Sequence, residues 1–238
     1  MNELKLSVLM PTYKNPMIGE IVTKAHDAII SKFEPGTVEF IVTEDGSGDS
    51  TPELLKRLAP KCGITPNLCS KNRGYLAVSK ELYALAKGEY LFFMDSDGEH
   101  DPADFWLLWN EMKEKNWDIV VGYKLNRRPY SRLLISKANN FLLGMFFGIW
   151  LNDANCGFRI IKRDVAQQLV PKVGNLPIAP NAEQLVWAKR MNYRFAQVGV
   201  KHINQESVTF TPGIKMLPVL LRAFKDLLVF RLRIGSLQ

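Results

Sequence analysis

The sequence lacks the features that mark exported, membrane-spanning and repetitive proteins. Its N-terminus has no basic segment followed by a long apolar stretch and a small-residue cleavage site, so no secretory signal is predicted. The longest apolar run covers residues 141–151, only about half of the roughly 20 residues that a spanning helix needs. No repeat, low-complexity tract or flexible linker divides the 238 residues. We therefore expect a single domain with a C-terminal extension.

Cysteine is also scarce. The three cysteines, Cys62, Cys69 and Cys156, are odd in number and lack metal-type spacing, which is typical of a reducing compartment. The sequence thus predicts a cytoplasmic protein, with any membrane contact at the cytoplasmic face. Acidic residues are outnumbered by basic ones, 24 to 31, and the net charge of +7 favours polyanionic partners such as nucleic acid, anionic lipid or phosphorylated substrates.

Short apolar runs alternate with amphipathic segments through the first half of the chain. Strands are predicted at 6–10, 38–42, 90–94 and 119–121, with helices at 17–32, 51–60 and 74–87. This alternation indicates an α/β fold with a mostly parallel sheet covered on both faces. The second half predicts helices at 133–150 and 181–192, a loop at 152–159, a strand near 194–200 and a final helix at 217–234.

Polar turns follow three of the predicted strands, at residues 11–13, 44–47 and 95–98. Ligands of such sheets bind outside the carboxyl ends of the strands, so these turns should meet at one edge. A carboxylate at a strand end, such as Asp45, can accept hydrogen bonds from ribose hydroxyls or from a base N–H. The sequence therefore predicts a nucleotide site at this edge.

Carboxylates stand at alternating positions of the turn after residue 94: Asp95, Asp97 and Glu99. Carboxylates this close repel one another unless a cation compensates them, and a divalent ion needs only one or two of them when diphosphate oxygens complete its shell. Asp101 and Pro102 instead suit the N-cap and first position of a helix.

Five motifs occur in an order that resembles glycosyltransferase family 2. They are PTYKN at 11–15, TEDGSGDST at 43–51, NRG at 72–74, MDSDGEHDP at 94–102 and DANCGFRIIKRD at 153–164. Within that family the chain is similar to the dolichyl-phosphate mannosyltransferase-like and polyprenyl-phosphate glycosyltransferase group. The resemblance covers roughly residues 5–200.

The resemblance implies a GT-A fold, a Rossmann-like, mostly parallel sheet flanked by helices, over residues 1–212. For residues 213–238 the residue pattern itself predicts a C-terminal amphipathic helix that either contacts membrane or packs on the domain. The implied activity is inverting transfer of a hexose from a nucleoside-diphosphate sugar, of the GDP-mannose or UDP-glucose type, to a polyprenyl phosphate, with Mg²⁺ or Mn²⁺ as cofactor.

Site residues carried over by position fall into four overlapping groups. The resemblance assigns the nucleotide-sugar to Pro11, Tyr13, Asp45, Asp95, Ser96, Asp97 and Lys124, and the metal to Asp95, Asp97 and Glu99. It assigns acceptor or donor phosphates to Arg132, Arg159 and Lys215, and catalysis to Asp153, Asp97 and Arg159. If the acceptor is a hydroxyl, it needs a carboxylate base, for which Asp153 comes first and Glu183 second.

Other functions are compatible with parts of the pattern. A transferase of the same fold could act on a glycan or small-molecule hydroxyl, and a nucleotidyltransferase also combines an α/β sheet with Mg²⁺ carboxylates. A nonenzymatic nucleic-acid or membrane-binding module would account for the net charge of +7 and the basic C-terminal helix. That helix could equally pack on the domain.

Overall fold

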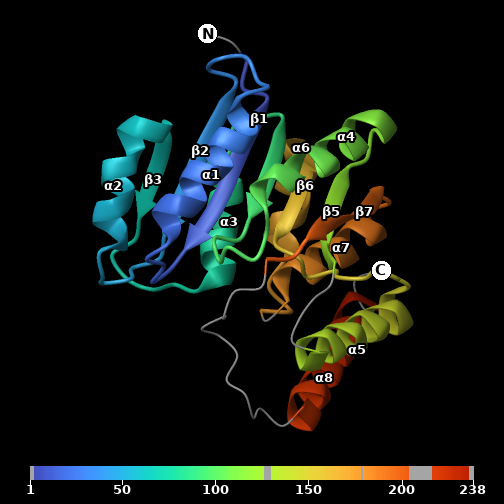
Figure 1. The fold of residues 1–238 in the computed structure, drawn as a ribbon. Helices are drawn as coiled ribbons and strands as arrows, with labels where there is room; N and C mark the ends of the chain where they lie inside the picture. The colour runs from blue at the N-terminus through green and yellow to red at the C-terminus, as the bar shows by residue number, and fades with distance from the viewer. Residues whose placement is uncertain (1–2, 126–129, 178, 204–215, 236–238) are drawn as a thin grey trace.

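The computed structural model describes residues 3–125, 130–177, 179–203 and 216–235 (Figure 1). They form one seven-stranded sheet in the order β3-β2-β1-β4-β6-β5-β7. Its strands are β1 (Leu6–Thr12), β2 (Val38–Glu44), β3 (Ile64–Leu68), β4 (Tyr90–Met94), β5 (Ile119–Leu125), β6 (Phe158–Lys162) and β7 (Phe195–Lys201). Only β6 runs antiparallel to its neighbours, β4 and β5. The predicted α/β class with a mostly parallel sheet is confirmed.

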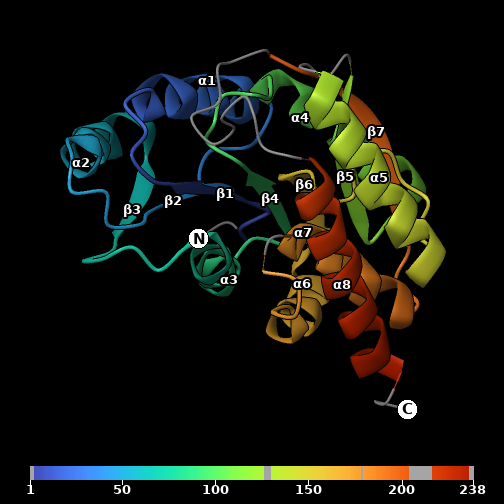
Figure 2. The ribbon, with the colours of Figure 1, turned by 90° about the horizontal axis from the view of Figure 1, so that it is seen from below.

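Helices cover both faces of the sheet. They are α1 (Ile18–Ile30), α2 (Thr51–Cys62), α3 (Tyr75–Leu85), α4 (Phe105–Lys115), α5 (Tyr130–Phe147), α6 (Arg163–Leu169), α7 (Pro180–Arg190) and α8 (Met216–Gly235), with 3₁₀ turns at Pro102–Asp104 and Val170–Lys172. Figure 2 shows α1, α2 and α4 on one face and α3, α6 and α7 on the other. Because both faces are covered, all seven residues of β1 are buried, which explains why its apolar run is continuous.

Two strands, the short helix α6 and one helix end differ from the predictions. The edge strand β3 contains Pro66, which interrupts the apolar pattern of a strand. The predicted loop 152–159 gives way to β6 at Phe158, because the chain turns back between β4 and β5 at that point. Helix α5 ends at Phe147 rather than at residue 150, since Gly148 adopts a φ of 66°, a left-handed conformation that ends helices.

The antiparallel direction of β6 determines which loops meet. The parallel strands β1, β2 and β4 all end at the lower edge of the sheet in Figure 1. Strand β6 begins at that edge, where Phe158 pairs with Met94. The loop before β6 therefore joins the turns after β1, β2 and β4, which is where ligands of α/β sheets bind.

Helices α5 and α8 lie side by side beyond this edge (Figures 1 and 2). Aromatic rings join them: the ring centroids of Phe146 and Phe224, and those of Phe147 and Phe230, are 5.4 Å apart. In the described part of the chain, no helix is both long and apolar enough to cross a membrane. The predicted domain boundary at residues 212 and 213 lies outside the described residues.

Candidate active site

The turn after β4 carries two neighbouring carboxylates. The Asp95 backbone N–H donates to the carbonyl of Gly157 over 2.9 Å, and Asp95 Oδ1 accepts from the Tyr75 hydroxyl over 2.8 Å. Burial and the negative charge of Asp97 raise the pKa of Asp95 to about 7. The exposed Asp97 accepts from the backbone N–H of Glu99 over 2.9 Å. Asp95 therefore resists ionisation in the absence of a nearby cation.

This donor set fits a divalent ion through two carboxylates. Asp95 and Asp97 supply hard oxygen ligands, and the raised pKa of Asp95 is the signature of a negative charge that a cation would compensate. Glu99 is 2% exposed and pairs with Lys124 and with His202, whose Nε2 lies 3.7 Å from Glu99 Oε2. That pairing argues against the predicted metal contact of Glu99. Within the described residues, no three or more histidine, cysteine or acidic side chains gather as a metal cluster.

Lys124 carries a permanent positive charge beside these carboxylates. Burial alone would lower its pKa, but the negative charges of Glu99 and Asp97 more than offset this and raise it. The cation therefore persists over the physiological pH range. Lys124 also lines the pocket described below, and its contact with the nucleotide-sugar stays a prediction.

Pro11 and Ser96 belong to one hydrogen-bonded layer at the ends of β1 and β4. The Ser96 hydroxyl donates to the Pro11 carbonyl over 2.6 Å, and the side-chain amide of Asn15 donates to the Ser96 carbonyl. Tyr13 is 45% exposed, and Lys14 Nζ lies 5.3 Å from the centre of its ring. The structure thus brings three of the predicted donor residues, Pro11, Tyr13 and Ser96, to one edge.

Asp45 organises the loop before α3. Its two carboxylate oxygens accept from the backbone N–H groups of Arg73 and Gly74, each over 2.8 Å. Gly46 packs so closely that an added Cβ would lie 2.4 Å from the backbone of Lys71. The carboxylate is 4% exposed, so its contact with a nucleoside stays a prediction beside this structural role.

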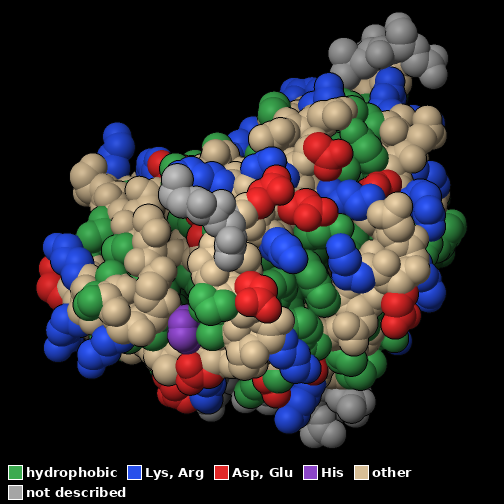
Figure 3. Space-filling model, turned by 90° about the horizontal axis from the view of Figure 1, so that it is seen from above, with side chains coloured by type: hydrophobic (Ala, Val, Ile, Leu, Met, Phe, Trp, Pro, Cys, Tyr) green, Lys and Arg blue, Asp and Glu red, His purple; other side chains and the backbone are tan. Residues whose placement is uncertain are grey.

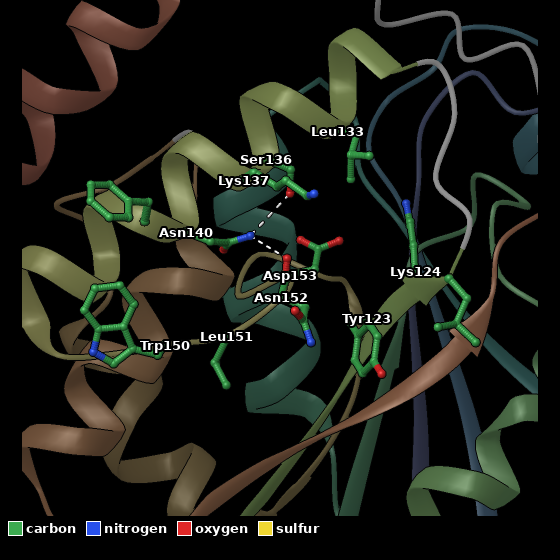
Figure 4. Close-up of a pocket in the computed structure, with 12 residues that line it drawn as sticks. Tyr123, Lys124, Leu133, Ser136, Lys137, Asn140, Trp150, Leu151, Asn152 and Asp153 are labelled. Atoms are coloured by element: carbon green, nitrogen blue, oxygen red, sulfur yellow. Dashed lines mark hydrogen bonds between the residues drawn. The ribbon is translucent and has the colours of Figure 1, made fainter.

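A pocket of about 510 Å³ opens between β5, α5 and the loop before β6 (Figure 4). Its lining is Tyr123, Lys124, Leu125, Leu133, Ser136, Lys137, Asn140, Phe141, Trp150, Leu151, Asn152 and Asp153. In Figure 4 the Asp153 carboxylate points into the space between Lys124 and α5. Asn140 fixes the loop: its amide donates to the Asn152 carbonyl over 2.6 Å and accepts from the Ala154 N–H over 3.1 Å.

One end of this pocket is polar and the other is aromatic. Lys124, Lys137 and Asp153 lie at the polar end, while Phe141 and Trp150 are 59% and 66% exposed, with ring centroids 6.0 Å apart. The apolar run at 141–151 is therefore only partly buried in the core, and it does not form a helix long and apolar enough to cross a membrane. One side of α5 is buried and the other presents aromatic groups beside charged ones.

The guanidinium of Arg159 is enclosed by acceptors from the protein itself. The residue is fully buried and donates to the carbonyls of Cys156, Asn181 and Ala154 and to the side chain of Gln184, over 2.6 to 3.0 Å. These bonds engage all three guanidinium nitrogens. This placement argues against the predicted phosphate-binding and catalytic roles of Arg159. Its hydrogen bonds instead hold the loop that carries Asp153.

Glu183 is also a structural group. It is fully buried, and Oε2 accepts from the backbone N–H groups of Gly174, Asn175 and Leu176 over 2.7 to 2.9 Å. Its other oxygen accepts from the side chains of Asn175 and Trp187. This enclosure by donors argues against the alternative in which Glu183 acts as a base.

Two predicted phosphate ligands fall partly or wholly outside the described residues. The backbone of Arg132 lies in α5, but its side chain is outside the described part of the chain, and Lys215 lies wholly outside it. The prediction for Asp101 is confirmed: its carboxylate accepts from the Ala103 N–H over 3.1 Å as the cap of the turn at Pro102–Asp104.

Three residues of the site escaped the sequence analysis. Tyr75 and Asn181 reach the Asp95 carboxylate as a hydrogen-bonded chain, and Asn140 holds the loop of Asp153. Tyr75 directly follows the NRG motif, and Asn140 is a polar residue within an apolar helix. Those signals were available in the sequence, whereas nothing marked Asn181.

The face on the side where β1 begins bears on the basic-surface alternative. In Figure 3 its lysine and arginine side chains are interspersed with aspartate and glutamate. They do not form one continuous basic patch on this face, so the net charge of +7 is not concentrated here.

A family model described as glycosyl transferase family 2 matches residues 7–170. The chain belongs to that family, as its five motifs predict. It is 26% identical over 171 residues to the dodecaprenyl-phosphate galacturonate synthase of Rhizobium johnstonii, covering 70% of this chain and 50% of that protein. Glycosyltransferase AglD of Haloferax volcanii is 28% identical over 204 residues, 83% of this chain and 33% of its own length. The chain thus spans half or less of these two relatives.

A third relative is more similar in extent. The dolichyl-phosphate beta-glucosyltransferase of Dictyostelium discoideum is 23% identical over 219 residues, which cover 84% of this chain and 66% of that protein. The names of the Rhizobium and Dictyostelium relatives match the polyprenyl-phosphate group that the motifs resemble.

Solved structures share the fold. Glucosyl-3-phosphoglycerate synthase from Mycobacterium tuberculosis, in complex with Mn²⁺, UDP and glucosyl-3-phosphoglycerate, has a TM-score of 0.68 at 18% identity, covering 96% of this chain and 80% of that one. Mannosyltransferase PcManGT from Pyrobaculum calidifontis, in complex with GDP-Man and Mn²⁺, has a TM-score of 0.64 at 18% identity, covering 98% and 65%. The predicted GT-A fold is confirmed.

Proposed function

We propose that this protein is an inverting, metal-dependent glycosyltransferase that moves a hexose from a nucleoside-diphosphate sugar to a polyprenyl phosphate. The observation that carries the proposal is the pair Asp95 and Asp97 at the ligand edge of a family 2 chain, with the pKa of Asp95 raised to about 7. Transfer of this kind leaves negative charge on the departing diphosphate, and a site that compensates this charge lowers the barrier.

The donor half of the site would hold Mg²⁺ or Mn²⁺ on Asp95 and Asp97. When bound, such an ion supplies Lewis-acid stabilisation of the leaving diphosphate. Lys124 adds a fixed positive charge from its position beside Glu99. Two of the solved structures that share the fold contain Mn²⁺ with UDP or GDP-Man, which supports a metal of this class.

The acceptor half would be the pocket beside α5. Lys124 and Lys137 offer two ammonium groups to a phosphate, and the exposed rings of Phe141 and Trp150 offer apolar surface to a hydrocarbon chain. The names of two relatives include dodecaprenyl phosphate and dolichyl phosphate, which supports the same acceptor class. A phosphate oxygen is already anionic and attacks without a strong base.

Asp153 favours a second candidate, transfer to a hydroxyl. Its carboxylate points into the pocket, where a hydroxyl acceptor would need a base. Asp153→Asn separates the two acceptors because it removes the base and keeps the size of the side chain. Transfer to a phosphate should then continue at a similar rate, whereas transfer to a hydroxyl should slow about 10²- to 10⁴-fold.

Radiolabelled UDP-glucose and GDP-mannose test the proposal directly. Each donor is incubated with Mn²⁺ and undecaprenyl or dolichyl phosphate in detergent, and label in the organic phase is counted. We expect transfer with one donor that Asp97→Ala abolishes. Asp27→Ala, which alters an exposed carboxylate on α1, is the control and should retain full transfer. Label that reaches only water-soluble hydroxyl acceptors would contradict a lipid acceptor.

We propose further that α8 contacts an anionic membrane surface. Leu221, Leu228 and Leu232 are 60%, 37% and 67% exposed and recur at a spacing that puts them on one face. Exposed arginines flank them at positions 222, 231 and 233. Apolar residues bordered by basic ones are typical of helices that lie in a membrane interface.

Vesicle sedimentation tests the contact of α8. The protein should sediment with vesicles that contain anionic lipid, and Leu232→Asp should weaken binding several-fold without changing the melting temperature. Equal sedimentation of the two proteins, or none of the wild type, would refute the contact.

A further inference from the structure

A hydrogen-bonded chain connects the interior of the second half of the protein to the Asp95 carboxylate. Asn181 Nδ2 donates to the Tyr75 hydroxyl oxygen over 2.9 Å, and that hydroxyl donates to Asp95 Oδ1 over 2.8 Å. A phenol has one proton to donate. Because Asn181 occupies the phenol oxygen as a donor, the proton of Tyr75 is directed to the carboxylate.

Both Tyr75 and Asn181, the two donors of this chain, are themselves held in place. Tyr75 is the first residue of α3, directly after Gly74, whose N–H is bound by Asp45. Its ring meets Phe93 edge to face, with centroids 6.2 Å apart. Asn181 is 5% exposed, and its backbone carbonyl accepts a hydrogen bond from the Arg159 guanidinium over 2.9 Å.

The carboxylate of Asp95 is confined on its other side by Gly157. A Cβ added at that glycine would lie 1.9 Å from Asp95 Oδ2. Tyr75 fixes one oxygen and the glycine surface limits the other, so the side chain has little freedom to rotate. A ligand oriented in this way binds a metal without first being ordered.

We propose that Tyr75 is a positioning residue that orients Asp95 for the divalent ion. The inference rests on the proposed function, since it takes Asp95 to be a metal ligand. Tyr75 would act through its hydrogen bond to Asp95 and would not itself be a ligand of the ion. The arginine-to-asparagine-to-tyrosine chain makes the orientation of the carboxylate depend on α7, outside the segment 7–170 that the family model matches.

The test compares Tyr75→Phe with Tyr83→Phe. Tyr83 lies two turns further along α3 and its ring also contacts Phe93, with centroids 5.4 Å apart, so both changes remove one hydroxyl beside the same ring. Binding of Mn²⁺ is measured from the electron paramagnetic resonance signal of the free ion, with UDP and with GDP. Loss of an outer-shell partner typically weakens metal binding 10- to 100-fold.

We expect Tyr75→Phe to raise the Kd for Mn²⁺ at least about 10-fold and Tyr83→Phe to leave it within about twofold. The melting temperatures of both variants without metal should stay close to that of the wild type. Asn181→Ala should weaken Mn²⁺ binding in the same direction, and its effect should not add to that of Tyr75→Phe, because the two residues act in one chain.

Two other results are informative in different ways. An unchanged Kd in Tyr75→Phe, together with loss of Mn²⁺ binding in Asp95→Asn, would overturn the positioning role and leave the proposed metal site intact. Absence of Mn²⁺ binding by the wild type with either nucleotide would overturn both.

Discussion

Replacing Asp95 with asparagine should stabilise the metal-free protein while removing a ligand of the proposed metal site. The pKa of Asp95 rises from 3.8 to about 7 because of burial and the charge of Asp97. A raised pKa in the folded state means that the associated stability is fully present below pH 3.8 and is lost as the pH rises through about 7. At 1.36 kcal/mol per pH unit, the ionised carboxylate costs at most about 4 kcal/mol at pH 8.

The asparagine amide removes this cost and can still accept a hydrogen bond from Tyr75. The gain should be largest at pH 8, should shrink to about 1 kcal/mol near pH 4.5 and should vanish at lower pH. For a domain of this size, 1 kcal/mol moves the melting temperature by about 2 to 4 °C. We therefore expect Asp95→Asn to melt up to about 8 to 16 °C above the wild type at pH 8 in EDTA, as followed by circular dichroism.

With Mn²⁺ and UDP or GDP added, the wild type should instead melt at a higher temperature than Asp95→Asn. Only the wild type binds the ion in this argument, so only the wild type is stabilised by it. Asp27→Asn is the matched control. The Asp27 side chain is 72% exposed, so this change should alter the free energy of unfolding by less than about 0.5 kcal/mol at pH 8 and at pH 4.5. If Asp95→Asn is no more stable than the wild type at pH 8 in EDTA, the two carboxylates do not oppose folding and the argument for a cation site loses its electrostatic basis.

Two further predictions concern residues beside the site. Glu183→Gln should lower the melting temperature by about 6 to 12 °C. The change places an amide donor against backbone N–H groups in a fully buried position, which costs about 3 kcal/mol. A fall in turnover at an unchanged melting temperature would instead support Glu183 as a base. Gly157→Ala should weaken Mn²⁺ binding at least about 10-fold, because the new Cβ displaces Asp95. Gly19→Ala, whose Cβ would lie 3.4 Å from Leu54, is its control in the same titration, and equal affinities would contradict the prediction.

Most of the fold could be predicted because its pattern is local. Five of the seven strands were recognisable as apolar or partly apolar segments, and the alternation with helices indicates the parallel sheet. The two strands that were not predicted, β3 and β6, lack a recognisable local pattern. Strand β3 contains a proline at an exposed edge, and β6 follows a loop whose reversal depends on pairing with β4 and β5, far away in the sequence.

The site could be predicted only in part, since a charged residue in a motif does not reveal its partner. Asp95 and Asp97 were recognisable because repulsion between close carboxylates is itself a local signal. Arg159, Glu99 and Glu183 looked alike as charged residues near the ligand edge. The structure pairs Glu99 with Lys124, encloses Glu183 in backbone donors and directs Arg159 to backbone carbonyls.

These buried charges still bear on function, because they join the two halves of the chain. The carbonyls that Arg159 binds belong to the loop before β6 and to α7, and Asn181 of α7 leads through Tyr75 to Asp95. Asp45 in turn holds the segment that ends at Tyr75. The proposed nucleoside, metal and acceptor parts of the site therefore share one hydrogen-bonded framework. A change in α7 should then alter the proposed donor site without touching any ligand, which separates residues proposed to bind the donor from residues that hold those residues in place.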